Sequence, residues 1–122
     1  MSTPPPLLSE GEIGLSSTAT KDVLEHHGAA VLSGDIDAVM EDYTDDSVFI
    51  SNIGGVLRGV NAIRPVFEMG RDYSSFQGTT QYIEGEEAYA TWTAEGVGFG
   101  TDTFIIRDGK IVVQTVAIFL VE

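Results

Sequence analysis

Asp102 is the side chain in this sequence with the clearest capacity for chemistry. It lies in an alternating run in which one face carries small or apolar residues, namely Gly98, Gly100, Phe104 and Ile106. A carboxyl group on such a face loses hydration, which disfavours its charged form and raises its pKa. We therefore expect Asp102 to donate a proton or a hydrogen bond near neutral pH, unless it is a structural carboxyl satisfied by backbone or water.

His27 is the second candidate for chemistry. It lies on the apolar stripe of a predicted helix with Val23, Ala30 and Val31, so we expect it to point toward the core. Histidine changes charge near neutral pH and can act as a donor or as a base. The alternative is a core histidine bonded to a nearby carbonyl. His26 is predicted to face outward, and two adjacent histidines with no third ligand at helical or strand spacing predict no metal site.

Trp92 and Gln114 are candidate ligand-binding residues on the predicted inward faces of two strands. The neighbours of Trp92 on its face are Ala88, Ala90 and Ala94. Such small residues leave space for a planar ligand beside the indole, unless the ring itself fills the cone. Gln114 lies between Val112 and Val116, and a buried glutamine needs a hydrogen-bond partner. Both are therefore predicted to contribute to a pocket.

Asn52 and Tyr43 complete the candidate set. Asn52 ends the first predicted strand and shares a face with Val48 and Ile50, which we interpret as the inward face. Its amide can hydrogen-bond a carbonyl or hydroxyl group of a ligand. Tyr43 lies on the apolar stripe of a short helix, where it either lines the mouth of a pocket or packs in the core.

The first half of the chain is predicted to begin with an arm and two helices. Residues 1–17 include three consecutive prolines and predict a loose, flexible arm, which leaves residues 18–122 as the folded domain. A first helix begins near Thr20, a potential N-cap, and stops at Gly34. Asp35 then caps a second short helix, whose apolar stripe is Ile36, Val39, Met40 and Tyr43.

A hairpin and a third helix follow. The strand from Ser47 to Asn52 turns at Gly54-Gly55 into a short strand from Val56 to Arg58. The third helix is predicted from Val60 to Met69, and Pro65 inside it predicts a late start or a distortion.

The last part of the chain reads as long alternating strands. Their predicted ranges are Phe76–Glu84, Glu87–Glu95, Gly98–Arg107 and Lys110–Val121. Asp108-Gly109 predicts a tight hairpin, because both central positions of that turn need a positive φ. Helices that precede an antiparallel sheet indicate the α+β class.

One face of this sheet is predicted to lie opposite the core. It carries threonines interleaved with apolar and aromatic residues, namely Tyr89, Thr91, Thr93, Phe99, Thr101, Thr103 and Ile105. A flat face of this kind favours a homodimer contact. The alternative is an ordinary half-polar, solvent-exposed sheet.

Composition limits the classes of partner. The chain has 122 residues and 19 acidic against 6 basic side chains, a net charge of −13, which fits one domain. This charge argues against nucleic acid and anionic membrane as partners. No cysteine is present, and no motif predicts a cofactor. The apolar run Ile111–Val121 is shorter than the roughly 20 residues of a membrane span. With no signal peptide predicted, a cytoplasmic location is the default expectation.

Three segments of the sequence resemble a known superfamily. LSGDIDAVMEDYTDDSVF, LRGVNAIRPVF and DTFIIRDGKIVVQTVAIF resemble the SnoaL-like and steroid delta-isomerase-like families of the NTF2-like superfamily, over residues 20–121. The resemblance implies a cystatin-like cone, in which three helices pack on a curved, mostly antiparallel sheet around a deep apolar pocket. It also implies a homodimer. Because this fold hosts unrelated activities, the resemblance is weakly specific for function.

The resemblance implies roles for two of these residues, and at one further position the sequence departs from the isomerase pattern. Asp102 matches the acid that steroid isomerases use as an oxyanion donor, and His27 falls where they carry a donor tyrosine. SnoaL-like cyclases resemble this chain in having an aspartate in that part of the fold. The general-base carboxylate that steroid isomerases place at the end of the first strand is replaced by Ser51-Asn52, which puts isomerase-type proton shuttling in doubt.

Three functional hypotheses follow. The first is an isomerase or cyclase-like enzyme that acts on a hydrophobic, carbonyl-bearing molecule through Asp102, with His27, Asn52 and Gln114 orienting the substrate. The second is a non-catalytic module that binds a hydrophobic small molecule or serves as a dimeric adaptor, which the missing strand-end carboxylate favours. The third is a structural dimer whose cone is filled by its own side chains.

Overall fold

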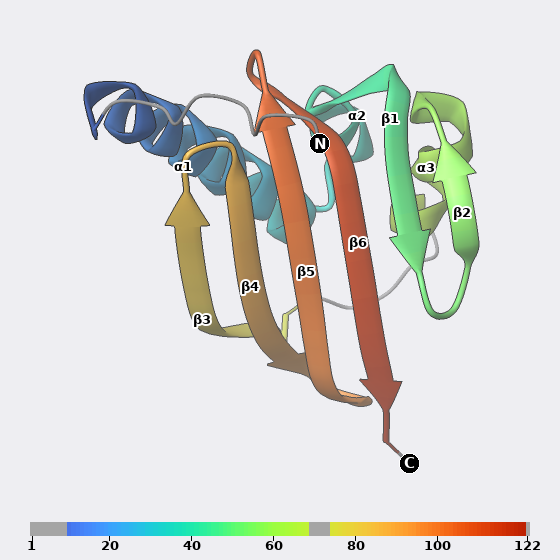
Figure 1. Cartoon of the computed structure of the whole chain (residues 1–122). Coiled ribbons are helices and arrows are strands. Elements are labelled where there is room, and N and C mark those ends of the chain that lie inside the picture. Colours follow the sequence, from blue (N-terminus) through green and yellow to red (C-terminus); the bar gives the residue numbers. More distant parts are fainter. Residues whose placement is uncertain (1–9, 69–73, 122) are drawn as a thin grey trace, which may run out of the picture.

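The computed structural model describes residues 10–68 and 74–121 of the chain. Within them two helices are followed by a two-stranded hairpin, a third helix and a long four-stranded meander (Figure 1). Among these helices, none has the length and apolar character needed to cross a membrane. The elements are α1 (Glu10–Ser33), α2 (Ile36–Met40), β1 (Tyr43–Ser51), β2 (Gly55–Arg58), α3 (Val60–Glu68), β3 (Gln77–Glu84), β4 (Glu87–Ala94), β5 (Val97–Arg107) and β6 (Lys110–Leu120).

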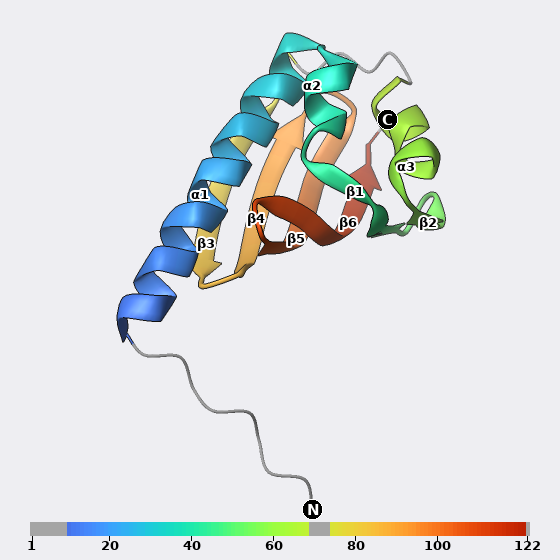
Figure 2. The same ribbon diagram turned by 90° about the horizontal axis from the view of Figure 1, so that it is seen from above.

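The strands form one curved sheet in the order β2-β1-β6-β5-β4-β3. All neighbouring pairs are antiparallel except β1 and β6, which run parallel. Helix α1 contacts β3, β4 and β5, while α3 contacts β1 and β2, and the view from above shows α1 and α3 enclosing the hollow side of the sheet (Figure 2). The predicted α+β class with a mostly antiparallel sheet is confirmed.

The β5–β6 hairpin forms where the sequence predicts it. Asp108 has a φ of 53° and Gly109 a φ of 76°, which are the left-handed values that a two-residue turn of this type requires. The hairpin pairs Arg107 with Lys110 and, beyond a register shift between Ile105 and Ile106, Asp102 with Val116. Because side chains alternate along strands, this register puts Asp102 on the helix-covered face.

Helix α1 begins earlier than the sequence predicts. Its first residue is Glu10, so Thr20 is a mid-helix residue and not the N-cap. Thr20 is buried, and its hydroxyl donates to the Gly85 carbonyl at 2.6 Å, while the Ser17 hydroxyl accepts from the Gly85 N–H at 2.9 Å. These bonds dock the β3–β4 turn on the helix. Residues 10–17 of the predicted arm are therefore helical, and residues 1–9 lie outside the described residues.

Helix α2 confirms one prediction and corrects another. The Asp35 carboxylate accepts a hydrogen bond from the Ala38 N–H at 3.1 Å, as an N-cap does. Tyr43, however, is the first residue of β1 and does not belong to the helix. The helical spacing from Val39 to Tyr43 was misleading, because α2 ends at Met40 and the chain becomes extended three residues later.

Helix α3 tolerates its internal proline. The helix begins at Val60, and the Ile63 N–H donates to the Gly59 carbonyl at 3.0 Å, so Pro65 does not delay the start as predicted. Gly59 has a φ of 86°, and a Cβ there would lie 2.9 Å from the Asp45 carbonyl oxygen, so only glycine fits before this helix. Met69, the predicted last residue, lies outside the described residues.

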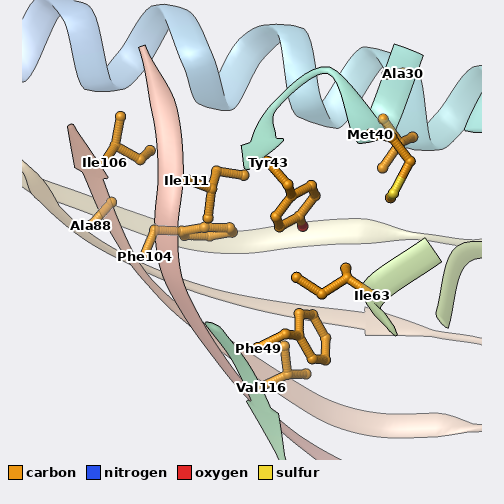
Figure 3. Close-up of a cluster of buried hydrophobic side chains, with 11 residues drawn as sticks. Ala30, Met40, Tyr43, Phe49, Ile63, Ala88, Phe104, Ile106, Ile111 and Val116 are labelled. Carbon is orange, nitrogen blue, oxygen red and sulfur yellow. The ribbon is translucent and has the colours of Figure 1, made fainter. Parts of the chain in front are cut away.

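The core fills the space between the three helices and the β1–β6–β5 part of the sheet. Val39, Ile63 and Ile111 have no exposed surface. Figure 3 shows Tyr43, Phe104 and Ile111 close together below α1, with Phe49, Ile63 and Val116 on the far side of the cluster. This packing fixes β1 and β6 against the helices, so the side chains that project between them have defined positions.

The outer sheet face carries exposed aromatic and aliphatic side chains. The strand register places one continuous row across it, which consists of Tyr82, Tyr89, Thr103, Thr115, Ile50 and Val56. Thr91 is a correction to the predicted contact set, because it is buried and its hydroxyl bonds to those of Thr79 and Thr80 at 2.6 and 2.5 Å.

Candidate functional site

A cavity of about 640 Å³ lies between the helices and the inner face of the sheet. Its wall is mostly apolar, with contributions from α1, β1, α3 and strands β3 to β6. The ionisable groups among the described residues that line it are His27 and Asp102. A cavity of this size and character suits a small, largely hydrophobic molecule.

Asp102 is the ionisable group on the sheet side of the cavity. Its Oδ2 accepts a hydrogen bond from Trp92 Nε1 at 2.8 Å, and its Oδ1 accepts one from Gln114 Nε2 at 3.2 Å. Burial raises the pKa of Asp102 above its ordinary value, while the bonds from Gln114 and Trp92 and the charge of His27 lower it. Burial dominates, so the carboxyl holds its proton to a higher pH than a solvated aspartate does.

Trp92 positions Asp102 and depends on a glycine to do so. A Cβ at Gly100, the residue opposite Trp92 on β5, would lie 2.4 Å from the indole Cε2. The ring therefore lies flat against the Gly100 backbone, with Phe76 at a centroid distance of 5.3 Å. Trp92 is buried and lines the cavity, as does Asp102. The predicted place of Trp92 in the pocket agrees with this position, and its bond to Asp102 adds a role.

His27 reaches the cavity from α1. It is buried and meets three aromatic rings edge-on, those of Tyr43, Phe67 and Phe104, at centroid distances of 5.6, 5.8 and 6.1 Å. Its Nε2 lies 3.5 Å from the Tyr43 hydroxyl oxygen, and its Nδ1 lies 3.2 Å from Asp42 Oδ2. His27 is thus held at both nitrogens, and its bonding partners are side chains and not the carbonyl of the alternative interpretation.

Gln114 joins the two halves of the site. It is buried on β6, and while its Nε2 donates to Asp102, its Oε1 accepts from the Tyr43 hydroxyl at 2.5 Å. The partner that a buried glutamine needs is therefore present on both sides of the amide. Gln114 lines the cavity, whereas Tyr43 lies one step behind it and holds the amide in place.

Asn52 does not face the cavity, so that prediction is wrong. Its side chain is exposed and bonds to the backbone of Ile118, with Nδ2 donating to the carbonyl at 3.0 Å and Oδ1 accepting from the N–H at 2.9 Å. The inward residues of β1 are instead Phe49 and Ser51, which both line the cavity. The Ser51 hydroxyl accepts from the Gly54 N–H at 2.8 Å, which leaves its proton to donate to a ligand.

Asp42 is a buried residue of this site that the sequence did not reveal. It follows α2, and its two carboxylate oxygens bond to two histidines, with His26 Nδ1 at 2.8 Å from Oδ1 and His27 Nδ1 at 3.2 Å from Oδ2. In the sequence it lies in an acidic run with Glu41, Asp45 and Asp46, which is typical of a solvated surface. Among the described residues, Asp42 and the two histidines included, no group of His, Asp or Glu side chains is arranged to hold a metal ion.

The raised pKa of Asp102 predicts a pH-dependent contribution to stability. The unfolded chain releases this proton at a lower pH than the folded protein does, so the free energy of unfolding decreases as the pH rises through the folded-state pKa. Asp102→Asn removes this pH-dependent contribution to the free energy of unfolding. We therefore expect the stability of the variant, measured by urea unfolding, to increase relative to wild type from acidic to neutral pH. Asp108→Asn, in the exposed β5–β6 turn, is the control, and parallel pH profiles for wild type and Asp102→Asn would contradict the expectation.

Comparisons with known structures show the same fold in several bacterial proteins. An NTF-2 like protein of unknown function from Burkholderia xenovorans LB400 is similar, with 19% identity and a TM-score of 0.75 over 89% of both chains. A candidate polyketide cyclase from Sinorhizobium meliloti has 22% identity and a TM-score of 0.66 over 78% of this chain and 93% of that one. An LEH-like epoxide hydrolase from M. tuberculosis has 15% identity and a TM-score of 0.68 over 84% of both chains.

The sequence pattern of the SnoaL-like domain family matches residues 24–114, three quarters of the chain. No curated protein matches. The matched segment contains every polar residue that lines the cavity, His27, Asp102 and Gln114 among them. The three structural relatives agree with it in fold, at identities too low to carry function. This chain belongs to the SnoaL-like domain family and has the NTF2-like fold.

Proposed function

We propose that this protein is a small acid–base enzyme of the isomerase or cyclase type that acts on a hydrophobic, carbonyl-bearing molecule. The substrate occupies the cavity, and its carbonyl oxygen accepts a hydrogen bond or a proton from Asp102. His27 lies on the same cavity and serves as the second acid–base group. The roles follow from residue chemistry, since a proton donor in an apolar site stabilises the negative charge that develops on a carbonyl oxygen.

The observation that carries this proposal is the environment of Asp102. Its carboxyl lies in a largely apolar cavity, and burial raises its pKa. A carboxylic acid kept neutral in this way can donate a hydrogen bond at neutral pH. The names of the structural relatives agree only in part with an isomerase or cyclase, because they include an epoxide hydrolase besides a candidate polyketide cyclase.

Ser51 supports a second candidate function, that of a module that binds a hydrophobic small molecule without converting it. It lies at the inward end of β1, on the cavity wall, where the resemblance to steroid isomerases would place a carboxylate base. A hydroxyl bonded to a backbone N–H is a poor base, so His27 must supply basicity if there is turnover. If His27 does not act as a base, the hydrogen-bond donors of the cavity, Asp102 and Ser51, would only hold a ligand in place.

Incubation with a panel of small molecules separates the two functions. The panel holds unsaturated ketones, polyketide-like β-dicarbonyl compounds and, for the third chemistry seen among relatives, cyclic epoxides. We expect NMR to show isomerisation or ring closure of a carbonyl compound by the wild-type protein. Binding of a panel member with no chemical change over hours would favour the binding module, and hydrolysis of an epoxide alone would overturn the choice of substrate.

We also propose that the outer sheet face forms a homodimer. The exposed row across it ends in Tyr82, which is 68% exposed, and in Val56, which is 67% exposed, while Phe99 and Phe119 pair beside it at 6.5 Å. An apolar face of this extent is typical of a contact between identical subunits. A cytoplasmic location stays a prediction.

A charge near the centre of this face is expected to dissociate the dimer. Thr103 is exposed and lies in the middle of the row, so Thr103→Glu brings two like charges together across a two-fold contact without disturbing the monomer core. Sedimentation velocity should show a dimer for wild type and a monomer for Thr103→Glu. Asn61→Glu adds the same charge at an exposed position of α3, and this variant should remain dimeric. A monomeric wild-type protein would refute the proposal.

A further inference from the structure

A chain of hydrogen bonds connects the cavity to a buried carboxylate behind it. From Asp102 it passes to Gln114 at 3.2 Å, to the Tyr43 hydroxyl at 2.5 Å, to His27 Nε2 at 3.5 Å, and from His27 Nδ1 to Asp42 at 3.2 Å. Tyr43, His27, Asp42 and Gln114 are all buried. Each buried donor needs an acceptor and each buried acceptor needs a donor. The direction of one hydrogen bond in such a chain therefore fixes the direction of the next.

In the first arrangement Asp102 is a carboxylate. Gln114 donates to it through Nε2 and accepts the Tyr43 proton through Oε1. The Tyr43 oxygen must then accept from His27 Nε2–H, and the Asp42 carboxylate accepts from His27 Nδ1–H. Both ring nitrogens carry protons, so His27 is an imidazolium.

In the second arrangement Asp102 keeps its proton. The oxygen and nitrogen of a glutamine amide exchange places by a half-turn, so Gln114 can present its oxygen to Asp102 and its N–H to Tyr43. Tyr43 then donates to an unprotonated His27 Nε2, while His27 Nδ1–H still donates to Asp42. Asp102 has gained one proton and His27 has lost one, so the total number of protons is the same in both arrangements.

The state excluded by this chain has Asp102 charged and His27 neutral. With the amide in its first orientation, the His27 lone pair faces a Tyr43 oxygen that has given its proton to Gln114. With the amide turned, the Gln114 oxygen faces the Asp102 carboxylate. Either way two acceptors face each other, at the buried His27–Tyr43 contact or at the partly buried Gln114–Asp102 contact, and this mismatch disfavours the state.

We infer that Asp102 and His27 share one proton through Tyr43 and Gln114, and that Asp42 is the positioning residue that fixes the orientation of this relay. Asp42 always accepts from Nδ1, so Nε2 is the nitrogen of His27 that gains or loses the proton. The catalytic use of the relay rests on the proposed function. When Asp102 gives its proton to the substrate carbonyl oxygen and His27 Nε2 takes a proton from the substrate, the pair ends as a carboxylate and an imidazolium, the number of protons is conserved, and neither charge is left isolated.

The charges around the relay support this pairing. Towards Asp102, Trp92 on β4 and Gln114 on β6 present N–H groups, and His27 on α1 is the charged group that acts on it. Towards His27, the neighbours from α3 and β5 are the rings of Phe67 and Phe104, and the carboxylate is Asp42. The second oxygen of Asp42 is occupied by His26, whose side chain is half exposed and stands outside the relay.

Paired NMR titrations of the substrate-free protein test the shared proton. Carbon-13 signals report the Asp102 carboxyl, and nitrogen-15 signals report both His27 nitrogens. In wild type we expect the two residues to show common inflections, since coupled groups titrate as a unit. Asp102→Asn should remove the inflection at the shared midpoint from the His27 signals. Independent titration of the two residues in wild type would overturn the inference, and this arm needs no variant to fold.

Tyr43→Phe separates the relay from direct electrostatic attraction. It removes one hydroxyl from the middle of the chain and leaves the ring and the distance between Asp102 and His27 unchanged. We expect the common inflections to be lost in Tyr43→Phe and kept in Tyr82→Phe, the same change at an exposed tyrosine of the outer face. Common inflections that persist in Tyr43→Phe would show coupling through space alone and would refute the relay.

Asp42→Asn tests the positioning role. An amide can accept from or donate to His27 Nδ1, so neutral His27 should change from a single Nδ1–H tautomer in wild type to a mixture of tautomers in the variant. A single Nδ1–H tautomer in both proteins would refute the role of Asp42. Because none of these measurements uses a substrate, a protein that converts nothing but shows coupled titration would contradict the proposed function and leave the relay standing.

Discussion

Asp102→Asn is expected to lower turnover of any carbonyl compound that the wild-type protein converts by about 10²- to 10⁴-fold, the contribution of a positioned general acid or base. Asparagine has the shape of aspartate and can still accept from Trp92 Nε1, which donates to Asp102 at 2.8 Å. It has no acidic proton to give. The loss should therefore appear in kcat more than in KM, because the proton is needed in the transition state and not for binding.

The matched control is Asp108→Asn, the same chemical change in the exposed β5–β6 turn. Asp108 has a positive φ, which asparagine also adopts readily, so this variant should keep wild-type turnover. Both proteins should unfold cooperatively, which shows that a loss of activity in Asp102→Asn does not come from misfolding. If Asp102→Asn retained full turnover, Asp102 would not be the acid, and the binding module would become the better account of the cavity.

The sheet and its hairpins could be predicted because local signals determine them. Asp108-Gly109 requires the left-handed φ values that the structure shows. Alternation within β5 places Asp102 on the inward face, but its contact with Gln114 also needs the register shift between Ile105 and Ile106, because Asp102 pairs with Val116 and not with Thr115 as the turn alone would set. The inward position of the central carboxyl could therefore be predicted from the alternation of its own strand, whereas its contact with Gln114 depends on a register shift that the turn residues do not predict.

The face of β1 could not be predicted from alternation. Both faces of that strand carry apolar residues, since Val48 and Ile50 alternate with Phe49. The pattern is therefore compatible with either face pointing inward, and Asn52 was assigned to the wrong one. A register shift against β6 between Tyr43 and Val48 adds a second ambiguity, because a bulge changes the face on which later residues lie.

Asp42 and the start of α1 were beyond sequence reasoning for another reason, namely that tertiary contacts determine both. Asp42 resembles its acidic neighbours until α1 brings two histidines to it. Glycines and serines before Thr20 predicted an arm, yet Ser17 and Thr20 bond to Gly85 in the β3–β4 turn. Bonds between residues more than 60 positions apart leave no local pattern.

Gly100→Ala is expected to displace the indole that holds Asp102. The added Cβ would lie 2.4, 2.5 and 2.8 Å from three atoms of the Trp92 ring system. A fused ring cannot bend away, so the indole must rotate or the strands must separate. We expect the free energy of unfolding to decrease by about 1–3 kcal/mol, the usual cost of overpacking.

The same substitution should also disturb the site, and the chain offers a direct readout. Trp92 is the only tryptophan, so its fluorescence emission reports this one indole. Gly100→Ala should shift the emission and, because the bond from Trp92 lowers the pKa of Asp102, raise the Asp102 titration midpoint further. Gly78→Ala is the matched control, since Gly78 pairs with Trp92 from the other side and its added Cβ meets nothing within 4 Å. Wild-type stability and emission in Gly100→Ala would show that Trp92 is not held against Gly100, and the account of how Asp102 is positioned would fail.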